Sequence, residues 1–120
     1  MMVRTASLWL LALGLAATPA WPQDAGVNDD VQQGHHLALL ICANCHVAAS
    51  DQQFDPILRP PAPTFQSIAQ RSTTTADWLK AFLTSNHRDI SKPEGMPNPR
   101  LMDYQVRQVS AYLLSLPKQP

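Results

Sequence analysis

Two cysteines and a histidine stand close together in the sequence and could carry out chemistry as one group. Cys42 and Cys45 are the only cysteines of the 120-residue chain, and His46 directly follows the second one. Thiols at this spacing can form a disulfide, bind a metal ion, exchange disulfides, or attach a haem by adding to its vinyl groups. In the haem case the histidine imidazole becomes a ligand of the iron.

The alternatives to haem attachment each lack something that they need. A disulfide between Cys42 and Cys45 would close a very short loop, so it would stabilise little. A thioredoxin-like dithiol needs a strand before its helix, and no segment alternates as a strand would. A zinc site needs a second pair of cysteines or histidines at usable spacing, which the sequence lacks. The motif C-x-x-C-H therefore predicts one covalent haem c, with iron bound by His46.

The motif must be positioned by the helix before it and the loop after it. Apolar and small residues recur at helical spacing up to Ile41, and Asn28 or Asp29 is a suitable N-cap, so we expect a helix that runs into Cys42. From Val47 to Pro63 no period is present, and the prolines of this stretch exclude a regular helix. The segment is expected to be a loop that wraps around the cofactor.

Three further helices are expected after this loop. A short one is plausible over residues 64–71, and a longer one over 75–85, capped by Thr74 or Thr75. A second proline-containing loop, 86–100, leads to a final helix over 103–115, which Pro117 ends. The pattern predicts an all-α fold.

The first residues are typical of a secretory signal peptide. Arg4 precedes an unbroken apolar run from Leu8 to Ala17, and small residues follow up to Ala20. The run is too short for a membrane span, which needs about 20 residues. We expect a cleaved signal peptide at 1–20, a flexible segment at 21–28 and one domain at 29–117, with no membrane span after cleavage.

The charge of the chain argues against nucleic acid as a partner. Nine basic and nine acidic side chains give a formal net charge of zero. Nucleic-acid binding needs a clustered excess of Lys and Arg, which is absent from the sequence.

The chain resembles the class I c-type cytochromes, the small bacterial monohaem cytochromes c, from about Asp30 to Leu116. Gly34 stands eight residues before Cys42, where this family has a glycine at the crossing of the N- and C-terminal helices. Tyr112 in the last helix matches the aromatic residue that packs against that glycine. The segment 96–101 (MPNPRL) resembles the methionine loop of these proteins. The resemblance implies a cytochrome c fold, with two shorter helices and long loops around the haem.

The resemblance also implies further site residues. Met96 is expected as the sixth iron ligand, and Pro61 as the residue whose carbonyl accepts a hydrogen bond from the His46 ring. Met96 could instead fill a gap in the core, which is a common use of methionine. Met102 and His87 are the alternative ligands. His35 and His36 are expected to be a solvated pair on the first helix, or one of them to be partly packed.

These features predict an exported, periplasmic carrier of single electrons that is not itself an enzyme. Its partners would be redox proteins that bind transiently near Asn44, Pro97 and Asn98, such as a dehydrogenase, an oxidase or another cytochrome, and we expect a monomer. One alternative is a haem subunit bound permanently to an oxidoreductase, which an exposed apolar patch would favour. Another is a ligand-binding or peroxidase-like haem protein with an open sixth position.

Overall fold

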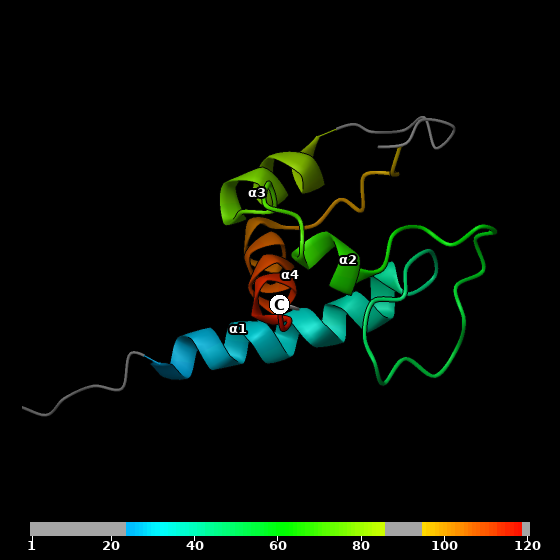
Figure 1. Cartoon of the computed structure of the whole chain (residues 1–120). Helices are drawn as coiled ribbons and strands as arrows, with labels where there is room; N and C mark the ends of the chain where they lie inside the picture. The colour runs from blue at the N-terminus through cyan, green and yellow to red at the C-terminus, as the bar shows by residue number, and fades with distance from the viewer. Residues whose placement is uncertain (1–23, 86–94, 119–120) are drawn as a thin grey trace, which may run out of the picture.

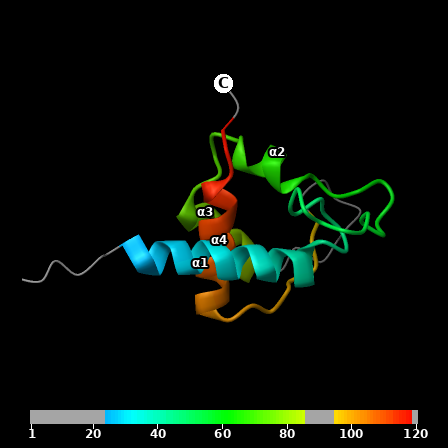
Figure 2. The same cartoon turned by 90° about the horizontal axis from the view of Figure 1, so that it is seen from below.

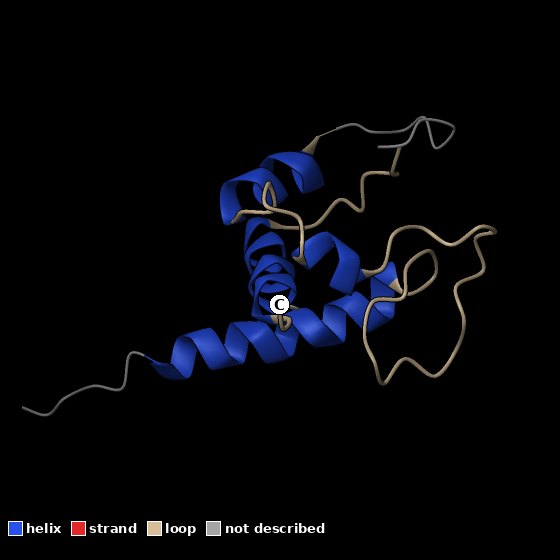
Figure 3. Cartoon of the chain, viewed as in Figure 1, coloured by secondary structure: helices blue, strands red, loops and turns tan. Residues whose placement is uncertain are grey.

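The computed structural model describes residues 24–85 and 95–118. The predicted signal peptide and His87 lie outside the described residues. Regular structure in these ranges is helical, with no strand (Figure 3). The prediction of an all-α fold is confirmed. In chain order the elements are α1 (Asp24–Leu37), the π-helical turn η1 (Ala38–Cys42), α2 (Phe65–Ala69), α3 (Ala76–Thr84) and α4 (Asp103–Ser115) (Figure 1).

Helices α1 and α4 cross each other at Gly34. Both views show α1 lying across α4 (Figures 1 and 2). A Cβ atom added to Gly34 would lie 1.9 Å from the carbonyl oxygen of Gln108 and 2.8 Å from Cβ of Tyr112. Only a residue without a side chain allows this approach, so the predicted role of Gly34 at the crossing is confirmed. On the exposed side of the pair, Arg107 Nε lies 2.8 Å from Asp30 Oδ2.

The start of α1 differs from the expectation. The helix begins at Asp24, not at an N-cap formed by Asn28 or Asp29, so the part of the predicted flexible segment from 24 to 28 is helical. N-cap preference is a weak signal when the preceding residues can also continue the helix.

The end of this helix widens into the π-helical turn η1. Its closing hydrogen bond runs from the Ala43 amide to the Ala38 carbonyl oxygen at 3.0 Å, five residues back. The helix therefore continues into Cys42 as predicted, but with one extra residue in its last turn. Such π-turns are rare and are frequently found at functional sites.

The short helix α2 is shorter than the predicted range 64–71, with Thr64 as its N-cap, whereas Thr75 is one of the two predicted caps of α3. Thr64 Oγ1 accepts from the Ser67 amide at 3.0 Å at the start of α2, and Thr75 Oγ1 accepts from the Trp78 amide at 3.1 Å at the start of α3. Helix α4 has the predicted bounds. Its N-cap, Met102, makes no side-chain cap hydrogen bond, but its own amide donates to Gln105 Oε1 at 2.9 Å.

The core lies around α4, against which α1, α2 and α3 pack. The buried apolar side chains are those of Ala38, Ala48, Ala49, Phe65, Ala69, Leu79, Leu83, Val106, Val109, Tyr112 and Leu113.

Within residues 24–85 and 95–118, none of the helices combines the length and apolar character that crossing a bilayer requires.

Candidate functional site

The C-x-x-C-H motif forms a tight turn at the end of η1. The carbonyl oxygen of Cys42 accepts hydrogen bonds from the amides of Cys45 at 3.1 Å and of His46 at 3.0 Å. This turn brings the two thiols and the imidazole to one end of the first helix. Both cysteines are half-buried and are not joined in a disulfide. The arrangement matches the one that the motif predicts.

The surroundings of the Cys42 thiol disfavour disulfide exchange. Burial raises the pKa of the Cys42 thiol to about 11, and the charge of Cys45 adds to the rise. Thiolates are the species that exchange disulfides, so a thiol with this pKa is a poor redox nucleophile at neutral pH. The described part of the chain contains no group of three or more His, Cys, Asp or Glu residues that could hold a metal ion.

One ring nitrogen of His46 is fixed by a backbone carbonyl. The Nδ1 atom lies 2.6 Å from the carbonyl oxygen of Pro63, and because a carbonyl can only accept, Nδ1 carries the proton. The Nε2 atom then has a free lone pair, as an iron ligand requires. A hydrogen bond of this kind also sets the ring orientation and makes the ligand more basic.

The acceptor is Pro63, so the expectation that Pro61 plays this role was wrong. The reason is the register of the backbone pairing between the motif and the loop. His46 and Ala62 form an isolated parallel bridge, in which the Ala62 amide donates to the Cys45 carbonyl oxygen at 2.9 Å. In this register the residue after Ala62, Pro63, presents its carbonyl to the ring.

The His46 ring is also held by an aromatic contact. The imidazole and the Phe65 ring pack edge to face, with centroids 5.6 Å apart and planes at 64°. Phe65 is 5% exposed, and its amide donates to the Val47 carbonyl oxygen at 3.0 Å. The ring of Phe65 in turn lies 6.3 Å from that of Tyr112 in α4. The position of His46 is therefore linked to the core and to the helix crossing.

Met96 and Met102 differ in their surroundings. Met96 is half-buried and packs against the apolar core, whereas Met102 is 63% exposed. Met96 is one of several partly buried apolar residues that pack against the core. The others are Val31, Leu37, Leu39, Cys42, Ala43, Ile68, Trp78, Leu101 and Leu116.

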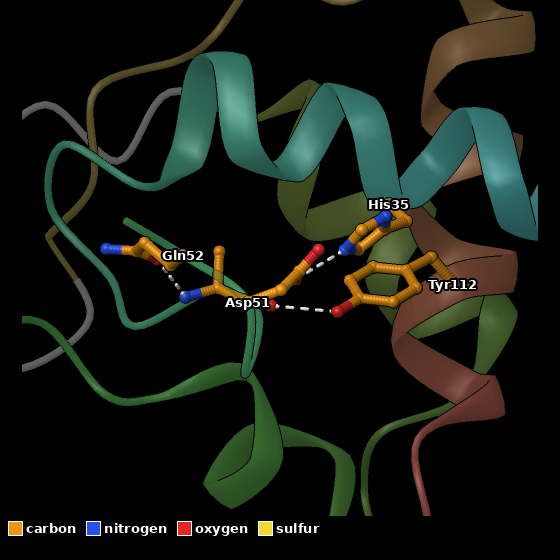
Figure 4. Close-up of polar contacts among 5 residues, drawn as sticks. His35, Asp51, Gln52 and Tyr112 are labelled. Carbon is orange, nitrogen blue, oxygen red and sulfur yellow. Dashed lines mark hydrogen bonds and ion pairs between the residues drawn. The ribbon is translucent and has the colours of Figure 1, made fainter. Parts of the chain in front are cut away.

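The two histidines of α1 have different surroundings. His35 is partly packed, which is one of the two expected alternatives. Its Nε2 donates to Asp51 Oδ1 at 2.8 Å, and its ring meets the Tyr112 ring edge-on at 5.0 Å (Figure 4). His36 is exposed.

Sequence reasoning missed the polar contacts of the loop after His46. Gln52 Oε1 accepts from the Ala48 amide at 2.9 Å, and the Tyr112 hydroxyl donates to the Ala48 carbonyl oxygen at 3.2 Å (Figure 4). A glutamine in an irregular loop has no periodic pattern, so nothing in the sequence distinguished it from its neighbour Gln53.

Comparison with known proteins gives one match. The family model described as cytochrome c matches residues 31–117, a range that contains both cysteines, His46, Pro63 and Met96. No curated protein and no solved structure matches the chain. The predicted cytochrome c fold is confirmed by this match together with the helical structure.

Proposed function

Since the chain belongs to the cytochrome c family, which carries covalent haem c and transfers electrons, we propose that it is a single-electron carrier with His46 and Met96 as iron ligands. Cys42 and Cys45 attach the haem. The bond from His46 Nδ1 to the Pro63 carbonyl oxygen carries the proposal, because it leaves Nε2 free and aims the ring. The haem iron, when bound, supplies the centre that gains and loses the electron.

The choice of Met96 rests on burial and on its place in the chain. A ligand must reach the iron within an apolar pocket, and the half-buried Met96 meets this condition better than the exposed Met102. A thioether opposite an imidazole raises the reduction potential of the haem. An iron bound on both faces has no open position for a substrate. These properties suit a carrier better than a catalyst.

The location and partners of the carrier are part of the proposal. The signal-peptide pattern of residues 1–20 supports export to the periplasm. There the protein would pass electrons between a dehydrogenase or similar donor and an oxidase or another cytochrome. Asn44 and Pro97 are both exposed, which suits transient contact beside the haem attachment. Such contacts are small, and we expect the free protein to be a monomer.

A second candidate function, a haem subunit bound to one oxidoreductase, is favoured by one observation. Phe54 and Ile57, in the loop after His46, are 81% and 78% exposed. Exposed apolar side chains are typical of a binding surface where they form a continuous patch, and these two are three residues apart in one loop. A partner that co-purifies with the wild type, and is lost from Phe54→Ser/Ile57→Ser, would support the subunit. Purification of the wild type as a monomer without a bound partner would support the free carrier.

The absorption spectrum tests the ligation. The mature protein is produced in a host that attaches haem, and its spectrum is recorded in both oxidation states. We expect low-spin iron with the methionine-to-iron charge-transfer band, which Met96→Ala abolishes and the matched control Met102→Ala leaves unchanged. Loss of the band in Met102→Ala alone would assign the ligand to Met102. High-spin iron that binds carbon monoxide in the wild type would contradict the carrier and favour an open sixth position.

A further inference from the structure

Gln52 makes three hydrogen bonds, and two of them join the loop to the backbone around His46. Its Oε1 accepts from the Ala48 amide at 2.9 Å. Its Nε2 donates to the carbonyl oxygens of Ala43 at 3.3 Å and Phe54 at 2.7 Å. Ala43 lies inside the C-x-x-C-H motif and Ala48 lies two residues after His46. One half-buried side chain therefore ties together the backbone on both sides of the histidine.

The opposite side of the same backbone is held by other groups. The Ala62 amide donates to the Cys45 carbonyl oxygen at 2.9 Å and the Phe65 amide donates to that of Val47 at 3.0 Å. These bonds flank His46 toward the segment that supplies Pro63. Gln52 adds side-chain support toward residues 48–54 of the loop, where the backbone itself is joined to the motif further along, by the Ile57 amide that donates to the Asn44 carbonyl oxygen at 2.9 Å.

The Ala48 peptide is the point at which this support reaches the helices. Its amide is bound by Gln52 and its carbonyl oxygen accepts from the Tyr112 hydroxyl at 3.2 Å. The Ala48 side chain is 1% exposed. Next to Gln52, Asp51 binds His35 of α1 at 2.8 Å (Figure 4). The loop is thus attached to both helices of the crossing.

We propose that Gln52 is a positioning residue for His46, which it holds in place through the backbone at Ala43 and Ala48. The inference rests on the proposed function, in which His46 binds the iron. Electron transfer changes the charge of the iron by one, and a ligand on a loosely held backbone would shift in response. A backbone held on both sides keeps the imidazole and its bond to Pro63 in one geometry, which sets the ligand's basicity and the reduction potential.

The test uses the protein with haem attached and compares three variants. Gln52→Ala removes all three hydrogen bonds. Gln52→Glu can keep the acceptor for the Ala48 amide, but a carboxylate cannot donate to the Ala43 and Phe54 carbonyls. Gln53→Ala is the matched control, because Gln53 is an exposed neighbour in the same loop.

Three quantities are measured: the reduction potential, the paramagnetically shifted proton signals of the His46 ring in the ferric protein, and the rate of electron self-exchange. We expect both Gln52 variants to shift the potential and the His46 signals, and to slow self-exchange by up to about tenfold. The control should match the wild type. If Gln52→Ala fails to attach haem, Gln52→Glu carries the comparison.

Two negative outcomes have different meanings. A wild type without shifted His46 signals would overturn the ligation, and the positioning role with it. A wild type with these signals, whose potential, signals and self-exchange are all unchanged in both Gln52 variants, would overturn only the positioning role. A loss of thermal stability alone would not support it, since any loop hydrogen bond can contribute to stability.

Discussion

Replacing Gly34 by alanine is expected to destabilise the protein strongly, although alanine is the better helix former. The new Cβ would lie 1.9 Å from the Gln108 carbonyl oxygen and 2.5 Å from its carbonyl carbon. These are backbone atoms of α4, so no side-chain rotation can relieve the contact and the helices must separate. Overpacking of a core costs about 1–3 kcal/mol, and more where backbone must move. The higher helix propensity of alanine offsets about 1 kcal/mol of this cost. Because backbone must move, the cost lies at the upper end of this range, and we expect a net loss of about 2 kcal/mol.

The matched control lies on the same helix. A Cβ added to Gly26 would have no atom within 4 Å, so Gly26→Ala should gain helix propensity without a clash and stabilise by up to about 1 kcal/mol. Both variants are unfolded in guanidinium chloride with haem attached, and their free energies of unfolding are compared with the wild type. Equal stability of Gly34→Ala and Gly26→Ala would contradict the close crossing of α1 and α4.

Two further substitutions test the contacts that hold the loop. The hydrogen bond from His35 holds the pKa of the Asp51 carboxyl below its usual range. A carboxyl with a lowered folded pKa stabilises above its unfolded pKa, about 4, and this stability is lost as pH falls through the folded pKa. The melting temperature of the wild type should therefore exceed that of Asp51→Asn near pH 6, with a gap that closes toward about pH 2; a gap independent of pH would contradict the contact. Tyr112→Phe removes the hydroxyl that donates to Ala48 and should cost about 1 kcal/mol in denaturant unfolding. Unchanged stability would show that this bond contributes nothing.

Local sequence patterns predicted the helices and the motif because their causes are local. Helix α4 has the predicted bounds because an apolar period and a proline after its end specify it without help from other elements. Thr75 caps α3 through its own side chain, as expected. The role of Gly34 at the helix crossing was predicted from the family resemblance and not from the apolar period of the helix. A glycine within a helix does not by itself indicate a close contact.

Register and loop contacts could not be predicted, because residues distant in sequence determine them. Pro60, Pro61 and Pro63 are equivalent candidates for the residue that accepts a hydrogen bond from the His46 ring, since each has a backbone carbonyl and none has a backbone N–H. Only the pairing of His46 with Ala62 decides that Pro63 faces the ring. The π-turn before Cys42 and the bonds of Gln52 likewise depend on which backbone groups the folded loop brings together.

The crossing of α1 and α4 is connected to the histidine site by a series of direct contacts. Gly34 allows α1 to approach α4 at Tyr112, and the hydroxyl of Tyr112 donates to Ala48, two residues from His46. The ring of Phe65 lies between those of Tyr112 and His46. A side chain at position 34 that separates the helices must therefore also move Tyr112. This movement disturbs the hydrogen bond of Tyr112 to Ala48 and its ring contact with Phe65. For this reason Gly34→Ala should shift the signals of the His46 ring as well as lower stability. Gly26→Ala, whose added Cβ has no atom within 4 Å, should leave the signals of the ring unchanged.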